Sequence, residues 1–404
     1  MFDYKLPDWR LSLATFGLGA AALMAACGGG GGDSASTAST LATPAAVSYS
    51  QGAITGFGSV FVGGVRFDDT GAAVADEDGN AHDRSELKLG MMVQVDAGTV
   101  DHAAATALAQ RIRFGNEVLG PVGAVDLTAS TVIVLGQTVR VTSSTVFDAA
   151  LAGGLSALTP GSVVEVHGIL DNANARIVAT RIEPKTGATA YRLRGTVAAL
   201  DTGLKTFTLG GQLISYAGLA PADVPANLAN GQIVRVVLQT TQQAGAWVAT
   251  RLRAGARLPD GPRDAHVEGA ITVFTSATSF SVNGLAVDAT NATFPDGKDG
   301  IVLGARVEVS GTVTQGVLVA TKVEIEDRRD AGRRPIELHG DIGNLDTTAK
   351  TFALRGMTVW FGGTGVVYVG GTQADLANGK KVEVLGVLSS DRTRVEAKIV
   401  GIGR

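Results

Sequence analysis

The chain has 404 residues, of which 45% are hydrophobic, 18% are charged and 5% are aromatic, and its formal charge is −4. This length exceeds what one hydrophobic core usually fills, so we expect several domains, and the mild acidity provides no general attraction to nucleic acid. A single cysteine excludes an internal disulfide framework and any metal site built from several cysteines. Abundant glycine beside valine and leucine favours turn-rich β structure over disorder.

Residues 1–26 have the pattern of a secretory signal peptide. Lys5 and Arg10 precede an apolar run at 11–23, which ends in small residues before Cys27. This run is too short to span a bilayer and is closed by small residues of the kind found at cleavage sites. One interpretation is an ordinary cleaved signal in which Cys27 has no role; the other depends on the residues around Cys27.

The end of this segment, LMAAC at 23–27, resembles the lipobox of bacterial lipoproteins, although Met24 stands where leucine is usual. The resemblance implies that Cys27 carries the lipid and becomes the mature N-terminus. With Gly28 in the next position, it also implies the outer membrane of a Gram-negative cell envelope, facing the periplasm or the surface. Residues 27–50, rich in Gly, Ser, Thr and Ala, are typical of a flexible tether.

From residue 51 onward, one short stretch occurs five times. Its clearest copy, LTPGSVVEV at 158–166, has an apolar residue, a glycine turn, and then valine, a polar residue and valine. Copies 70 to 75 residues apart contain GMMVQV (90–95), GSVVEV (161–166), GQIVRV (231–236), GARVEV (304–309) and GKKVEV (379–384). Self-similarity at a near-constant period indicates a repeat architecture.

The repeated stretch predicts a turn that leads into a half-buried strand. Glycine supplies a φ angle that is closed to residues with a Cβ, and period-two alternation places the two valines on one face. The expected inward pairs are Val93/Val95, Val164/Val166, Val234/Val236, Val307/Val309 and Val382/Val384. The expected outward residues are Gln94, Glu165, Arg235, Glu308 and Glu383.

Each unit also offers an opening strand, a hairpin and a closing strand, and no sustained helical pattern. The hairpins have a two-residue turn with glycine second, and Asn283-Gly284 is the strongest of these signals because a type I′ turn requires positive φ at both positions. Short, twisted strands favour closure into a barrel, since closure removes exposed edges. We therefore predict an all-β chain with about five OB-like barrels of five to six strands, repeats 1 to 5, at 51–115, 119–184, 192–254, 267–325 and 338–404.

Polar stretches at 185–191, 255–266 and 326–337 separate the later units and are typical of linkers. A lone barrel of this size rarely gains more than about 3–5 kcal/mol from its core. We therefore expect neighbouring repeats to pack against each other and to form a curved rod.

The repeats share G-x-[VI] at the start, F-x-[LV]-x-G in the hairpin, [LI]-x-x-G-x-x-V-x-V in the middle and A-T-[RK]-[ILV] at the end. This pattern resembles domain-of-unknown-function family 5666, small β-barrel modules often found in tandem behind lipoprotein signals. The resemblance covers roughly residues 51–404 and is best in repeats 2 to 4. It implies fold and location, and it supplies no catalytic residue.

The residues that carry chemistry form few patterns. No nucleophile elbow and no phosphate-binding loop occurs, and we expect no cofactor and no metal. The histidines occupy different places in their units, without zinc-ligand spacing: His82, His102, His167, His266 and His339. The acidic stretch Asp76–Asp83 suggests calcium, but its glycine comes too early for an EF-hand loop and no closing glutamate follows, so we expect a solvated hairpin loop.

One polar feature recurs, a basic residue in every closing strand: Arg111, Arg181, Arg251, Lys322 and Lys398. A structural role, with the stem over the barrel end and the head in water or beside a carboxylate, is the simpler interpretation. If the repeats stack with constant rotation, the five cations would form a stripe that binds an anionic polymer.

Two function classes follow. The first is a non-enzymatic lipoprotein of the cell envelope with a structural or binding role, whose partner is an anionic glycan or another envelope protein. The alternative is an enzyme or metal-binding factor with a site in the Asp76–Asp83 loop or between repeats. Nucleic acid is not an expected partner, because binding single strands requires exposed aromatic residues.

Overall fold

The computed structural model describes residues 47–255, 263–326 and 336–403, which form β-strands connected by turns and short 3₁₀ helices, with no α-helix in these ranges. Within the same ranges, no helix is long and apolar enough to cross a bilayer. The predicted signal segment, Cys27, most of the tether and most of the linkers at 255–266 and 326–337 lie outside the described residues.

Each repeat is a closed barrel of five main strands. In repeat 2, β8 (Val118–Asp126) pairs with β9 (Thr131–Val134), β9 with β10 (Gln137–Arg140), β10 with β13 (Arg176–Pro184), β13 with β12 (Val163–Asp171), and β12 again with β8. The β10–β13 pair is parallel and the others are antiparallel. This is the strand order of an OB-fold, which confirms the predicted class.

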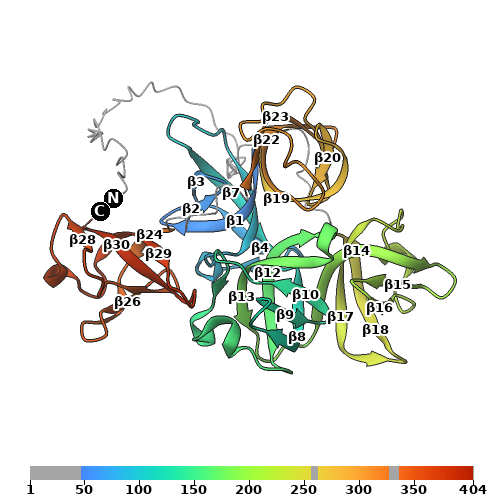
Figure 1. Cartoon of the computed structure of the whole chain (residues 1–404), viewed down its shortest axis with the longest axis horizontal. Helices are drawn as coiled ribbons and strands as arrows, with labels where there is room; N and C mark the ends of the chain where they lie inside the picture. Colours follow the sequence, from blue (N-terminus) through green and yellow to red (C-terminus); the bar gives the residue numbers. More distant parts are fainter. Residues whose placement is uncertain (1–46, 256–262, 327–335, 404) are drawn as a thin grey trace, which may run out of the picture. The chain divides into compact units, whose positions relative to one another are not determined.

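The other repeats close in the same order, and in repeat 5 the first strand is divided into two short strands. Figure 1 shows the repeats along the chain. Repeat 1 has β1 (Ser48–Phe57), β2 (Val60–Val62), β3 (Val65–Asp68), β6 (Met92–Ala97) and β7 (Thr106–Phe114). Repeat 3 has β14 (Tyr191–Asp201), β15 (Thr206–Leu209), β16 (Gln212–Ser215), β17 (Ile233–Gln243) and β18 (Ala246–Ala254). Repeat 4 has β19 (Arg263–Ser276), β20 (Ser279–Val282), β21 (Leu285–Asp288), β22 (Arg306–Thr314) and β23 (Val317–Ile325).

Repeat 5 has β24 (Ile336–Asp341), β25 (Gly343–Asp346), β26 (Thr351–Leu354), β27 (Met357–Trp360), β29 (Lys381–Leu388) and β30 (Arg394–Ile402). Short strands supplement these barrels: β4 (Ala73–Asp76), β5 (Ala81–His82), β11 (Val146–Phe147) and β28 (Val367–Val369). The 3₁₀ turns are η1 (Arg84–Glu86), η2 (Ala149–Leu151), η3 (Gly154–Ala157), η4 (Asn172–Asn174), η5 (Pro221–Asp223) and η7 (Gln373–Asp375).

The predicted turns are confirmed. Positive φ occurs at both central positions of every hairpin, including Asn283 (51°) and Gly284 (85°), as a type I′ turn requires. The glycine that precedes each Val-polar-Val strand also has positive φ, between 78° and 87° in all five repeats. A residue with a Cβ would be strained at these positions, so the repeated glycine has a conformational cause.

The inward valines fill the barrels as predicted, because all ten are at most 1% exposed. The outward residues differ from a simple half-buried strand. Gln94, Glu165 and Arg235 are also buried, whereas Glu308 and Glu383 are half-buried. Other segments therefore cover the outer face of this strand in repeats 1 to 3.

The repeats belong to one unit, Thr43–Arg404, in which the first strand of one repeat pairs with the first strand of another. β1 pairs in parallel with β19 and with β24, and β8 pairs antiparallel with β14. These pairings use residues just outside two of the predicted boundaries: β1 begins at Ser48, before residue 51, and β19 begins at Arg263, before residue 267. Packing between repeats therefore includes main-chain hydrogen bonding as well as side-chain contact.

Candidate functional site

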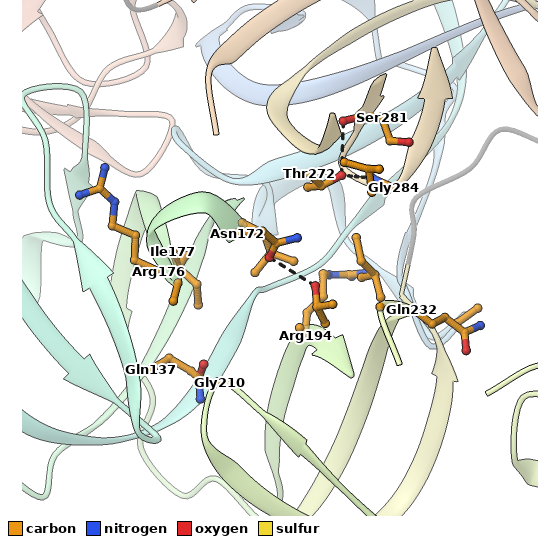
Figure 2. A pocket seen from close by; sticks show the side chains of 18 residues that line it. Gln137, Asn172, Arg176, Ile177, Arg194, Gly210, Gln232, Thr272, Ser281 and Gly284 are labelled. Atoms are coloured by element: carbon orange, nitrogen blue, oxygen red, sulfur yellow. Dashed lines mark hydrogen bonds between the residues drawn. The ribbon is translucent and has the colours of Figure 1, made fainter. Parts of the chain in front are cut away.

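A cavity of about 650 Å³ is lined by repeats 2, 3 and 4 (Figure 2). We call it the groove. Repeat 2 contributes Gln137, which follows the β9–β10 turn, and Asn172, which lies in η4 between β12 and β13. Repeat 3 contributes Gln232, just before β17, and repeat 4 contributes Ser281 of β20. Hairpins of the second and third strands, and the loop before the last strand, are the parts of OB-folds that bind oligonucleotides and oligosaccharides.

Several polar groups lining the groove are available to a ligand. The side-chain oxygen of Asn172 accepts a hydrogen bond from Thr196 Oγ1 at 3.3 Å, and that of Gln232 accepts one from the Ala229 amide at 3.3 Å. Because these oxygens are engaged, each amide presents its nitrogen as the remaining donor. In the described part of the chain, neither nitrogen has a hydrogen-bond partner, and neither does Ser281 Oγ.

The lining of the groove consists of amides, hydroxyls, two arginines and apolar groups. Among the described residues that line the groove there is no Asp, Glu, His, Cys or Lys, so its hydroxyl groups have no neighbouring base among them. The charged members are Arg176 and Arg194. Arg176 donates to Asp171 at 2.8 Å with its side chain 36% exposed, whereas Arg194 is buried against Glu77 and Glu117. A ligand in the groove would meet amides, hydroxyls and one accessible guanidinium.

Four of the five cations in the closing strands lie beside carboxylates in the part of the chain that the structure describes. Arg111 lies 2.8 Å from Asp96, and Arg251 lies 2.8 Å from Asp78. Lys322 lies 2.9 Å from Glu324. Lys398 is exposed and has no ion-pair partner within the described ranges. A binding stripe of these five residues stays a prediction.

Arg181 differs from the other four cations because its side chain is only 2% exposed. It donates to Asp148 Oδ2 at 2.6 Å, to Glu183 Oε2 at 2.9 Å and to the Leu89 carbonyl at 3.2 Å. Three hydrogen bonds donated by a buried guanidinium, one of them to repeat 1, indicate a packing role.

The acidic loop Asp76–Asp83 is exposed at residues 79–81 and Asp83, but Glu77 and Asp78 are covered and are not solvated as the sequence predicted. Asp78 accepts a bidentate hydrogen bond from Arg235, at 2.9 and 2.7 Å, and Glu77 accepts one from Arg194. The hydrogen bond from Arg235 holds the pKa of Asp78 far below its usual range, although burial opposes this. Arginines of repeat 3 therefore neutralise Glu77 and Asp78, two of the carboxylates that a calcium ion in this loop would require.

Four of the five histidines lie beside carboxylates, which their irregular positions in the sequence did not indicate. His82 contacts Glu86 at 2.9 Å, and His266 contacts Glu308 at 2.8 Å. His167 is fully buried and donates from Nδ1 to the Gly115 carbonyl at 2.9 Å; burial lowers its pKa, although Glu165 opposes this. His339 lies between two glutamates, while His102 is exposed.

Glu165 lies at the centre of a buried polar cluster on the outer face of repeat 2. It accepts hydrogen bonds from Asn116 Nδ2 and Lys185 Nζ, both at 2.7 Å. Burial raises its pKa, but His167, Lys185 and Asn116 outweigh burial and lower the pKa to about 2. The polar residue of the Val-polar-Val strand is therefore an ionised, fully partnered group here.

Sequence reasoning did not find the groove or the carboxylate partners of the histidines. The only local signal for the groove was the run of turn-forming residues at 172–175, between two strands. The signal for the glutamates was period-two spacing, as in Glu337 and His339, combined with the polar position of the Val-polar-Val strand. The first signal does not show which repeats meet at the groove. The second does not show in which register two strands of one repeat pair.

Comparison with known proteins places these repeats in one group. The sequence profile of the family described as "Domain of unknown function (DUF5666)" matches residues 120–183, 194–253, 268–324 and 339–399. No curated protein matches this chain. Among solved structures, the chain is similar to drosophila Unr CSD456, with 15% identity over 51% of this chain and 95% of that chain, and a TM-score of 0.13.

Proposed function

This chain belongs to the DUF5666 family, and because that family has no assigned activity, we propose a function from the groove and the N-terminal segment. We propose a non-enzymatic lipoprotein of the cell envelope, anchored through Cys27 in the outer membrane. Its tandem barrels bind an envelope glycan that carries negative charge. The observation that carries the binding role is that the amide nitrogens of Asn172 and Gln232 and the Ser281 hydroxyl line the groove without a hydrogen-bond partner among the described residues.

A glycan suits this set because every sugar hydroxyl both donates and accepts hydrogen bonds. The amide nitrogens of Asn172 and Gln232 would donate to sugar oxygens, and Ser281 Oγ can do either. A volume of about 650 Å³ lies in the range of ligand pockets, and Leu170, Ile177 and Ile233 add the apolar surface that such pockets use. Arg176 gives the preference for an anionic sugar, because a guanidinium pairs well with a carboxylate.

The enzymatic alternative has less support. Its candidate loop, Asp76–Asp83, is engaged by arginines of repeat 3, and the groove lining offers no acid–base residue in the described part of the chain. A second envelope protein as partner would require no defined pocket. The groove therefore favours the glycan.

The test is retention of the full chain, in detergent solution, on an immobilised uronic-acid polysaccharide and on its neutral counterpart. We expect retention on the acidic polymer that weakens with salt, since the Debye length is about 10 Å at 0.1 M. Replacing Asn172 and Gln232 together by Ala should abolish retention and change the melting temperature only slightly, because both side chains are half-buried and each makes a single long hydrogen bond, at 3.3 Å, within the described residues.

The matched control replaces an exposed asparagine and an exposed glutamine away from the groove, Asn291 and Gln242, by Ala. This control should bind as the unmodified chain does. Equal retention of both double variants would show that the groove is not the binding site. Release of new reducing ends from the polysaccharide would contradict the non-enzymatic assignment.

A further inference from the structure

The outer face of repeat 5 carries one histidine and two glutamates that the strand register brings together. β24 and β29 are antiparallel, and His339 is paired directly with Glu383. Glu337 precedes His339 by two residues on β24, so both side chains point to the same face, while Leu338 between them is buried in the barrel. The three residues therefore lie on rigid strands and not on a loop.

The distances suit a common ligand. His339 Nε2 lies 2.6 Å from Glu337 Oε1 and 3.8 Å from Glu383 Oε1, and the three ligand atoms lie within 4.8 Å of one another. Zinc takes one imidazole nitrogen and carboxylate oxygens at about 2.0–2.2 Å, which places neighbouring ligand atoms roughly 3.3 Å apart. Small rotations of the glutamate side chains would meet this spacing. The side chains are 19–34% exposed, so an ion can reach them and a water molecule can complete the coordination.

The charge balance of the cluster also favours a cation. In the part of the chain that the structure describes, no lysine or arginine forms an ion pair with Glu337 or Glu383. Two carboxylates therefore lie together on this face beside one imidazole. The more distant Arg66 influences Glu337 less than the hydrogen bond with His339 does. A bound divalent ion would neutralise both carboxylates.

Repeat 4 provides an internal comparison, because it carries the same residue types on the same strands in swapped order. His266 and Glu268 lie on β19, and Glu308 lies on β22 opposite Glu268. There, however, Arg306 donates to Glu268 Oε1 at 3.0 Å. The corresponding residue of repeat 5, just before the first valine, is the exposed Lys381. The guanidinium in repeat 4 thus occupies the role that a metal ion would fill in repeat 5.

Backbone packing fixes the histidine. β1 pairs with β24 at Phe57 and Leu338, and this brings Gly58 against His339. A Cβ at Gly58 would lie 2.4 Å from His339 Cβ, so only glycine leaves the imidazole in this position. Arg355 Nε donates to the His339 carbonyl at 3.1 Å and holds the strand from the other side. Metal sites depend on such supporting contacts as well as on the ligands.

We propose that Glu337, His339 and Glu383 form a binding site for a divalent transition-metal ion, with zinc as the ion that the donor set suits best. Magnesium and calcium prefer more oxygen ligands, and neither uses imidazole readily. The site is distinct from the groove and does not depend on the proposed glycan.

The test is isothermal titration of metal-free, full-length chain with zinc in detergent solution, without a histidine tag. We expect His339→Ala to bind one zinc equivalent fewer than the unmodified chain, and Glu383→Gln to weaken that site at least tenfold. Gly58→Ala should weaken it about 10–100-fold, the range seen when supporting contacts are removed. His266→Ala is the matched control, because Arg306 already forms an ion pair with Glu268 beside it. This variant should still bind the zinc equivalent that His339→Ala loses.

Circular dichroism melts of each variant establish that repeat 5 is folded, and His339→Cys provides a second test because a thiolate also binds zinc. Zinc should raise the melting temperature of the unmodified chain and of His339→Cys, but not that of His339→Ala. The proposal is overturned if the unmodified chain binds no zinc, or if the number of bound equivalents is the same with and without His339.

Discussion

Replacing Arg181 by alanine tests whether the cations of the closing strands belong to the barrel or to a ligand-binding stripe. Breaking a buried ion pair by removing one partner costs about 3–5 kcal/mol, because the other charge stays buried. Glu183 has a second cation partner, Lys88 Nζ at 3.1 Å, which remains after Arg181 is removed. The lower end of this range therefore applies. We therefore expect repeat 2 to lose about 3 kcal/mol of its free energy of unfolding.

Amide hydrogen exchange of peptides from β12 and β13 measures this loss of stability in the full chain, because exchange at these strands requires repeat 2 to open. If repeat 2 melts separately, its transition should fall by roughly 12–24 °C, because a domain of this size loses about 4–8 °C per kcal/mol. Lys322→Ala is the matched control. Its side chain is 43% exposed and has a single carboxylate partner at 2.9 Å, so the loss should be about 0–1 kcal/mol.

The reasoning is refuted if Arg181→Ala opens repeat 2 no more readily than Lys322→Ala opens repeat 4. Loss of polysaccharide retention with unchanged exchange would instead support the stripe. A double change, Arg181→Met with Glu183→Leu, separates the charge from the packing: removing both ions should recover most of the lost stability, because apolar replacements of buried pairs are often neutral.

Three further predictions concern pH, processing and boundaries. The pKa of Glu165 is lowered to about 2, so its stabilisation is complete above about pH 4.5 and is lost as the pH falls toward 2; the shift corresponds to at most about 3 kcal/mol. Glu165→Gln should therefore flatten the acid-unfolding curve followed by circular dichroism, and an unchanged curve would contradict the assignment. Cys27→Ser should move the chain from the detergent phase to the soluble fraction, and unaltered partitioning would exclude lipid attachment there. Brief trypsin digestion should cut at Arg257 before Arg263, because Arg263 begins β19 and lies 2.7 Å from Asp96; early cleavage at Arg263 would count against this strand boundary.

Much of the barrel fold could be predicted from the sequence because its causes are local. A positive φ angle admits glycine and few other residues, so the glycines before each Val-polar-Val strand and in each hairpin identify the turns. Period-two alternation then assigns the inner face, and valines such as Val164 and Val166 are buried accordingly. Asn283-Gly284 shows that even the turn type follows from two residues.

The contacts of the outer face could not be predicted, because they depend on which strands of different repeats meet. Asp78 is 157 residues from Arg235, and no pattern in either segment indicates the other. The same holds for Gly58 and His339, which approach through the β1–β24 pairing. An acidic loop is solvated by default, and only the position of repeat 3 makes this one an ion-pair junction.

The repeats therefore share their inner positions and differ in their outer ones, and this difference indicates where function resides. At the polar position of the Val-polar-Val strand, Arg235 binds an acidic loop, Glu165 joins a buried cluster, and Glu383 faces a histidine. A barrel of this size requires a filled interior and the correct turns. The outer residue is free to vary, except that a buried polar side chain needs a hydrogen-bond partner. Because repeat 4 satisfies its glutamate with Arg306 and repeat 5 does not, the same scaffold yields an internal ion pair in one barrel and a candidate cation site in the next. Outer positions whose charge no other described residue compensates are thus the most informative places to test for ligands in this array.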